Sequence, residues 1–179
     1  MALATGASEV LWQAEAPNYT PSLYESRRIQ ATAKDGTQVP ISLLYKKTFS
    51  PFGADGKPAG PPRPCVLDGY GSYGSCNDPY FSSMKLSLLD RGVVYAIGHI
   101  RGGSEMGRQW YEDMGKYLTK TNTFDDFAAC AQHLHNTGIS AQLNLAGVGR
   151  SAGGLLIGAT ANRSPHLFKV PHPPLRHPL

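Results

Sequence analysis

The sequence predicts an α/β fold in which a mostly parallel sheet carries helices on both faces. Short apolar runs rich in β-branched residues alternate with segments whose apolar residues recur at helical spacing. Glycine-rich turns separate the two kinds of segment. A helix between two strands returns the chain to the same edge of the sheet, so such strands pair in parallel. Hydrophobic residues make up 41% and charged residues 17% of the 179-residue chain, which favours one folded domain.

The sheet is expected to begin with a hairpin. Residues 28–34 and 39–46 have the pattern of two strands. The Asp-Gly pair between them is a strong hairpin signal, because glycine tolerates positive φ. Residues 1–27 show no sustained periodicity and are interpreted as a lead-in segment. Residues 50–64 are rich in proline and glycine, which weaken strand ladders, so an exposed loop is expected there.

Strands and helices then alternate. The expected strands are 65–68, 93–99 and 143–148, and the expected helices are 81–89, 123–137 and 152–162. In the middle helix, which Gly138 ends, Thr123 and Asp126 match a capping box. Asp126 is therefore expected to stabilise the helix N-terminus. The acidic residues between 105 and 113 are compatible with a solvated turn.

Composition argues against several classes of function. The net charge is +4 and the basic residues do not cluster, which argues against nucleic-acid binding. The three cysteines fit no metal pattern, so free thiols and no metal or cofactor are expected. No apolar run approaches the roughly 20 residues that span a membrane. The polar N-terminus does not resemble a signal peptide, so the default expectation is a cytoplasmic protein without membrane partners, whose oligomeric state stays open.

The strongest local motif surrounds Ser151. Residues 149–153 read Gly-Arg-Ser-Ala-Gly, which matches G-x-S-x-G, and they lie between an expected strand and an expected helix. A nucleophile elbow needs this context, because the chain must turn sharply to expose the serine hydroxyl. The alternatives are a tight turn packed with small residues and a phosphate loop. The Walker form of a phosphate loop fails because no Lys-Ser or Lys-Thr pair follows.

A second glycine-rich segment follows the strand expected at 65–68. Residues 69–74 read Gly-Tyr-Gly-Ser-Tyr-Gly. In α/β hydrolases one donor to the oxyanion comes from a loop after an earlier strand, and this segment occupies that place. The alternative is a simple glycine turn with two packed aromatic side chains.

Four runs together carry a family resemblance. They are DGYGSYG (68–74), SLLDRGVVYAIGHIRGGSEMGRQWYEDMGK (87–116), TNTFDDF (121–127) and GRSAGGLLIG (149–158). The chain resembles the prolyl oligopeptidase family of serine peptidases, most closely its oligopeptidase B branch, over roughly residues 23–169. The family joins an α/β-hydrolase domain to a β-propeller and cleaves short peptides after proline, or after Arg or Lys in that branch.

The resemblance implies roles for three residues. Ser151 matches the nucleophile, and the backbone N–H of Ala152 matches one oxyanion donor. Tyr70 matches the tyrosine whose hydroxyl is the second donor. The implied partner is a short peptide substrate, and the implied chemistry proceeds through an acyl-enzyme.

The chain departs from the family pattern after Ser151. No Asp or Glu follows it, although the family's acid and histidine come later in the chain. His166 falls where the family has a polar loop residue, and His99 is interpreted as structural. Residues 28–169 are thus expected to form only the N-terminal part of an α/β-hydrolase domain, and residues 170–179 a divergent Pro-rich tail. The sequence-level alternatives are an inactive fragment or splice product and a serine esterase.

Overall fold

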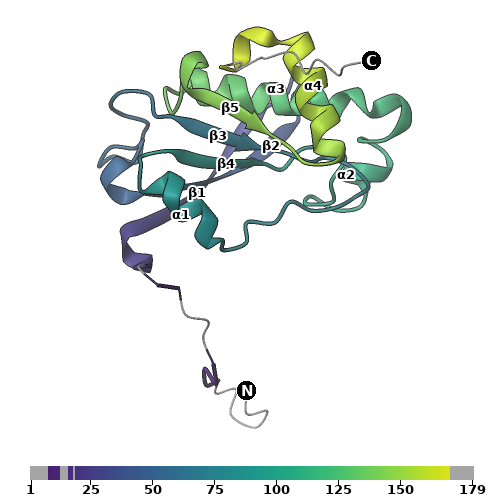
Figure 1. Cartoon of the computed structure of the whole chain (residues 1–179). Helices are drawn as coiled ribbons and strands as arrows, with labels where there is room; N and C mark the ends of the chain where they lie inside the picture. Colours follow the sequence, from purple (N-terminus) through teal and green to yellow (C-terminus); the bar gives the residue numbers. More distant parts are fainter. Residues whose placement is uncertain (1–7, 13–15, 18, 170–179) are drawn as a thin grey trace, which may run out of the picture.

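The computed structural model describes residues 8–12, 16–17 and 19–169, which centre on a five-stranded sheet (Figure 1). The strand order is β1-β2-β4-β3-β5. The strands are β1 (Tyr24–Thr32), β2 (Gln38–Lys46), β3 (Cys65–Asp68), β4 (Val94–Gly98) and β5 (Leu145–Val148). The predicted tail, residues 170–179, lies outside the described residues.

The sheet is mixed, so the prediction of a mostly parallel sheet is wrong. Strand β3 pairs in parallel with β4 and β5, as the alternation of strands and helices predicts. Strand β2 pairs antiparallel with both β1 and β4. The hairpin explains the first of these pairings, because the short connection of residues 33–37 can join only antiparallel strands. Strand β1 also begins at Tyr24, so residues 24–27 of the predicted lead-in belong to the sheet.

Helices cover both faces of the sheet, as predicted. The longer helices α3 (Thr121–Asn136) and α4 (Ala152–Arg163) lie on one face, and α1 (Ser83–Leu89) lies on the other (Figure 1). A short helix that the sequence did not indicate, α2 (Gln109–Glu112), follows β4. None of the helices in the described residues has the length and apolar character needed to cross a bilayer.

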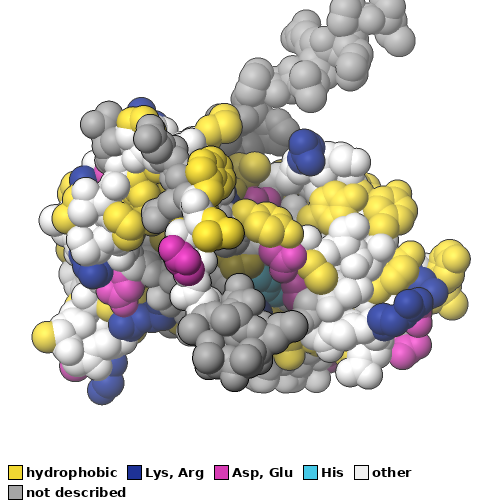
Figure 2. Space-filling model, turned by 90° about the horizontal axis from the view of Figure 1, so that it is seen from below, with side chains coloured by type: hydrophobic (Ala, Val, Ile, Leu, Met, Phe, Trp, Pro, Cys, Tyr) yellow, Lys and Arg dark blue, Asp and Glu magenta, His cyan; other side chains and the backbone are white. Residues whose placement is uncertain are grey.

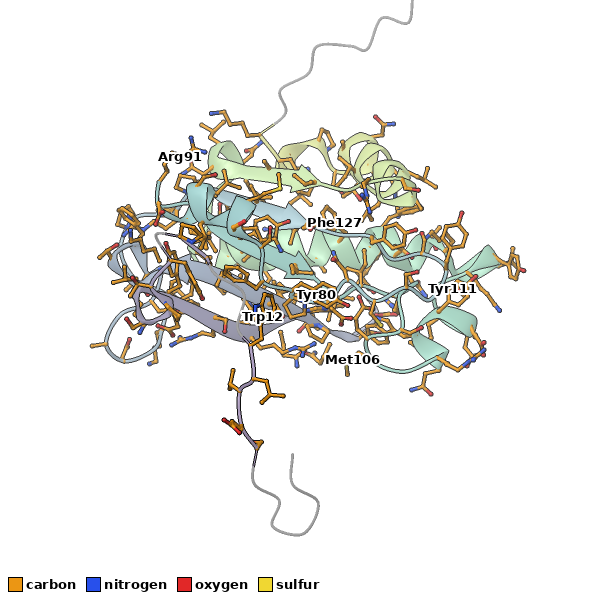
Figure 3. All side chains as sticks on the ribbon, turned by 60° about the horizontal axis from the view of Figure 1, so that its bottom comes forward. Trp12, Tyr80, Arg91, Met106, Tyr111 and Phe127 are labelled. Atoms are coloured by element: carbon orange, nitrogen blue, oxygen red, sulfur yellow. The ribbon has the colours of Figure 1, made fainter. Side chains whose placement is uncertain are left out.

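The main core lies between the sheet and α3. Phe127, Cys130, Ala131 and Leu134 recur at helical spacing and are fully buried. Phe127 points from α3 toward the strands (Figure 3). Alternate residues of β2 reach the same core, since successive side chains of a strand point to opposite faces. A buried side chain of the size of Leu134 or Phe127 contributes about 1.5–3 kcal/mol through removal from water.

The opposite face of the sheet is less covered. Apolar side chains are visible across it in the view from below (Figure 2). The exposed large apolar residues near α1 and in the loop after β4 are Tyr80, Phe81, Met84 and Met106. Tyr80 and Met106 lie on the near side of the sheet in Figure 3, whereas Phe127 lies beyond it.

Asp126 is a core residue and not a helix cap, which corrects the capping-box prediction. Helix α3 begins at Thr121, and its N-cap residue Lys120 makes no side-chain capping bond. The Asp126 carboxylate is fully buried and accepts hydrogen bonds from the backbone N–H and the Nε of Arg101, each at 2.9 Å. Arg101 also reaches Asp35 in the hairpin turn and lowers the pKa of that carboxyl to about 2.

Candidate active site

Ser151 occupies the sharp turn between β5 and α4. Its φ of 56° and ψ of −121° lie outside the regions that a residue with a β-carbon ordinarily adopts. Such strained backbone is concentrated at functional sites, where the surrounding structure enforces it. Helix α4 begins at the next residue, Ala152, and Ser151 is exposed. The serine hydroxyl is therefore presented to solvent beside the free amides of a helix N-terminus.

The two outer glycines of the motif are required by close backbone approaches. A β-carbon at Gly149 would lie 2.3 Å from the carbonyl oxygen of Gly153. A β-carbon at Gly153 would lie 2.8 Å from the carbonyl oxygen of Gly69. The first glycine thus lets the turn close, and the second lets the loop after β3 come up to the start of α4.

Tyr70 lies on that loop, immediately beside the Ser151 turn. The backbone N–H of Gly69 donates to the carbonyl oxygen of Val148 at 3.0 Å, which joins the carboxyl ends of β3 and β5. A β-carbon at Gly153 would lie 3.7 Å from Tyr70 Cδ2. The structure therefore brings Tyr70, Ser151 and Ala152 together at the carboxyl ends of β3 and β5, as the sequence predicts.

Tyr70 and Ser151 line one open cavity of about 680 Å³. The other lining residues come from the end of β3, the loop after it and the turn before Ser151. They are Asp68, Gly69, Ser75, Cys76, Asn77 and Arg150. Among the described residues, no histidine lines this cavity. The described residues also contain no group of three side chains suited to holding a metal ion. The cavity thus brings the side chains of Ser151 and Tyr70 into one space, and its described lining contains no histidine.

His99 belongs to a separate cluster. It is buried, and its Nε2 lies 2.8 Å from the Oγ of Ser42, while its Nδ1 lies 3.9 Å from a carboxylate oxygen of Glu105. These residues have the composition of a catalytic triad. However, Ser42 sits within β2, paired with β1 and β4 on its two sides, and not at the start of a helix. This position offers no elbow and no helix amides for an oxyanion. The structural role of His99 stays a prediction.

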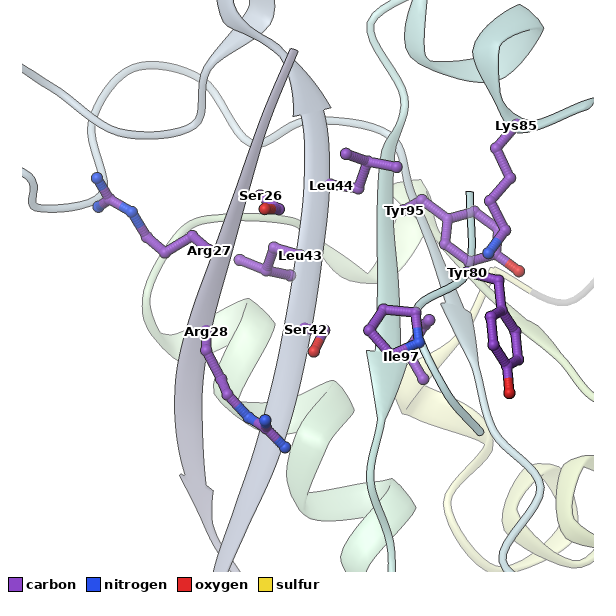
Figure 4. A pocket seen from close by; sticks show the side chains of 11 residues that line it. Ser26, Arg27, Arg28, Ser42, Leu43, Leu44, Tyr80, Lys85, Tyr95 and Ile97 are labelled. Atoms are coloured by element: carbon purple, nitrogen blue, oxygen red, sulfur yellow. The ribbon is translucent and has the colours of Figure 1, made fainter. Parts of the chain in front are cut away.

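Ser42 also lines a second cavity of about 260 Å³, whose walls include residues of β1, β2 and β4 (Figure 4). Arg28 and Lys85 lie on opposite sides of it, and the Lys85 ammonium stands 4.3 Å from the centre of the Tyr95 ring. None of its lining residues lines the Ser151 cavity. Tyr95 connects the two regions, because its hydroxyl donates to Asp68 at 2.7 Å.

Sequence reasoning did not assign the two side chains that hold the loop after β3. The Lys120 ammonium donates to the carbonyl oxygen of Gly71 and, at 2.9 Å, to the Oγ of Ser72. The Glu105 carboxylate accepts a hydrogen bond at 2.9 Å from the backbone N–H of Asn77. Glu105 has a 6% exposed side chain, so the solvated turn considered for this segment is wrong at that residue. Both contacts are non-local, and no pattern along the chain marks them.

Comparison with known proteins identifies the family. A family model described as "Prolyl oligopeptidase family" matches residues 79–172, just over half of the chain. The chain belongs to the prolyl oligopeptidase family. It is similar to dipeptidyl aminopeptidase BI of Pseudoxanthomonas mexicana, with 47% identity over 93% of this chain and 22% of that protein.

Two solved oligopeptidase B structures confirm the resemblance to that branch of the prolyl oligopeptidase family. The protein from Leishmania major is 48% identical, with a TM-score of 0.79 over 86% of this chain and 20% of that one. The protein from Trypanosoma brucei, solved with covalently bound antipain, is 52% identical, with a TM-score of 0.77 over 84% of this chain and 20% of that one. The chain thus spans about a fifth of the length of these relatives.

Proposed function

We propose that this chain supplies the nucleophile and the oxyanion site of a serine peptidase that cleaves short peptides. The Oγ of Ser151 attacks the scissile carbonyl carbon. The N–H of Ala152 and the hydroxyl of Tyr70 bind the oxygen that becomes negative. The observation that carries the proposal is the strained, exposed Ser151 in one cavity with Tyr70. Donors held where charge develops stabilise the transition state more than the ground state.

The reaction proceeds in two halves. Attack forms a tetrahedral intermediate, whose collapse breaks the peptide bond, releases the amine and leaves an ester on Ser151. Water then attacks that ester and releases the acid. Each half needs a base to take a proton and an acid to return it, which in serine peptidases is a histidine oriented by a carboxylate. In this proposal both partners lie outside the described lining of the cavity.

Peptides are the proposed substrates. Membership of a peptidase family supports this class. The Trypanosoma brucei relative holds antipain covalently, so antipain is the inhibitor with which we propose to probe the same site here. An ester hydrolase on the same fold would use the same turn, and the test below includes an ester substrate to separate the two functions.

The test uses the longest natural form of the protein that contains this chain, called the full-length protein below. We expect a fluorophosphonate probe to label it at Ser151 and antipain to block the labelling. Peptide hydrolysis and labelling should both disappear in Ser151→Ala, because the nucleophile is gone. Ser75→Ala is the matched control, since Ser75 lines the same cavity without occupying the strained turn.

Two outcomes would contradict the proposal. Labelling that persists in Ser151→Ala would move the nucleophile elsewhere. Hydrolysis of a small ester, without turnover of any short peptide, would assign the site to an esterase.

A further inference from the structure

Lys120 is a half-buried lysine whose contacts lead to the candidate oxyanion site. It precedes the first turn of α3, and its ammonium donates to the Gly71 carbonyl oxygen and the Ser72 hydroxyl. Within the described part of the chain, no carboxylate lies within ion-pair distance of this ammonium. Burial lowers the pKa of Lys120, since it disfavours the charged form.

Partial burial of the Lys120 ammonium without a carboxylate partner costs free energy. Removing an ammonium from water requires compensation, and a buried charge usually obtains it from an opposite charge. Both polar partners of Lys120 in the described structure are uncharged oxygen atoms. Both belong to consecutive residues of the loop that carries Tyr70. A charge-assisted hydrogen bond to a carbonyl is stronger than a neutral one, and it fixes the orientation of the peptide that it binds.

The Gly71 peptide is enclosed on its other sides. Gly71 has a φ of 61°, and a β-carbon there would lie 2.5 Å from Thr123 Cγ2 and 2.8 Å from Ile100. A β-carbon at Gly102 would lie 2.0 Å from the Gly71 carbonyl oxygen. The first turn of α3 and the loop after β4 therefore hold this peptide between them, and Lys120 binds its carbonyl oxygen. Tyr70 immediately precedes it, so rotation of the Gly71 backbone would carry the tyrosine with it.

We propose that Lys120 is a positioning residue for Tyr70: it fixes the Gly71 carbonyl and thereby keeps the tyrosine hydroxyl at the oxyanion site. This inference rests on the proposed function, in which that hydroxyl binds the oxyanion. An oxyanion donor acts only when it is held in place before charge develops. Loss of the positioning contact therefore weakens transition-state binding and leaves substrate binding largely unchanged.

The test compares three substitutions of Lys120 in the full-length protein. We expect Lys120→Met to lower kcat by about tenfold to a hundredfold with little change in KM. A displacement of a catalytic group by about 1 Å has effects of this order. Lys120→Arg retains a cationic donor and should recover most of the loss. Lys120→Gln retains a neutral donor, should be intermediate, and carries the test if the methionine variant does not fold.

Lys46→Met is the matched control. Lys46 is also partly buried, but it pairs with Asp90 at 2.9 Å and lies among β1, β2 and the end of α1. We expect its substitution to leave kcat unchanged. A loss of kcat in Lys46→Met equal to that in Lys120→Met would overturn the inference, because loss of any partly buried lysine would then suffice.

A double-mutant cycle with Tyr70→Phe separates positioning from general stability. If Lys120 acts through the tyrosine hydroxyl, Lys120→Met has no further effect on kcat once that hydroxyl is absent. Equal losses in both backgrounds would overturn the inference, as would an unchanged kcat in Lys120→Met. Tyr70→Phe alone tests the proposed function. If it leaves kcat unchanged, the oxyanion role of Tyr70 fails, whereas a loss in Tyr70→Phe without one in Lys120→Met rejects the Lys120 inference alone.

Discussion

Gly153 and Gly154 are neighbours in the first turn of α4, yet their surroundings differ. A β-carbon at Gly153 would lie 2.8 Å from the backbone of Gly69, while nothing lies within 4 Å of one at Gly154. The sequence marks Gly153 because it completes the motif around Ser151. It does not show which atom the glycine must avoid, because Gly69 is distant along the chain.

Substitutions of Gly153 and Gly154 by alanine are therefore expected to have opposite effects on stability. We expect Gly153→Ala to destabilise the protein by about 1–3 kcal/mol, since rigid backbone must move to admit the methyl group. It should also lower kcat, because the loop that moves carries Tyr70. Gly154→Ala should raise stability by about 0.5–1 kcal/mol, because alanine favours the helix. Urea unfolding and peptide hydrolysis measure both effects, and equal behaviour of the two variants would refute the assignment of the close approach.

At the scale of elements, Arg101 joins three parts of the fold. It follows β4 and binds Asp126 in α3 and Asp35 in the turn between β1 and β2. The turn itself was predictable, because an Asp-Gly pair between two strand patterns is a local signal. The pairing of Arg101 was not, since its partners lie on either side of it at long sequence distances. The same contact explains the incorrect helix cap, because Asp126 is drawn into the core and away from the amides of its own helix.

Asp35 provides a test of this junction that depends on pH. Its folded-state pKa is lowered from 3.8 to about 2 by hydrogen bonding from Arg101. The resulting stability is therefore fully present above about pH 4 and is lost as the pH falls through about 2. Because the Asp35 side chain is 49% exposed, water screens the pair. We expect Asp35→Asn to cost only about 0.2–1 kcal/mol at pH 7.

The measurement is urea unfolding of wild type and Asp35→Asn between pH 7 and pH 2. The difference between the two proteins should shrink as the pH falls, because the asparagine mimics the protonated acid and keeps the acceptor for the Thr37 N–H. Asp55→Asn is the control, since Asp55 accepts a comparable turn bond from Lys57 N–H and pairs with no cation in the described structure. A difference that stays constant with pH would show that the charge of Asp35 contributes nothing.

At the scale of the whole molecule, exposed apolar side chains occur in β5 and in the segments before and after it. Strand β5 is an edge strand, and Leu143, Val148 and Leu155 around it are 71%, 46% and 62% exposed. The backbone N–H of Lys169 donates to the Leu145 carbonyl oxygen at 2.8 Å, so the chain after α4 returns alongside β5. Exposed strand edges and apolar patches promote association between copies.

We expect the 179-residue chain, produced by itself, to bind an apolar dye and to associate at micromolar concentration. Leu155→Lys should reduce both, because it replaces one of these exposed apolar side chains with a charged one. Leu118→Lys is the control, since Leu118 is 97% exposed in the turn before α3, away from that edge. Fluorescence titration and sedimentation velocity measure the two effects. A sharply melting monomer without dye binding, or equal effects of the two variants, would contradict this expectation.

The backbone hydrogen bond between Gly69 and Val148 bears on where the chain can change in length. Tyr70 and Ser151 follow adjacent strands, and the carboxyl ends of these strands are held at the spacing of a β-ladder, about 4.8 Å, and not by the course of a long loop. The proline- and glycine-rich segment 50–64 enters β3 from its other end. We expect insertions or deletions there to leave the carboxyl ends of β3 and β5 in place, together with Tyr70 and Ser151. The loop whose length can change and the residues Tyr70 and Ser151 thus lie at opposite ends of β3.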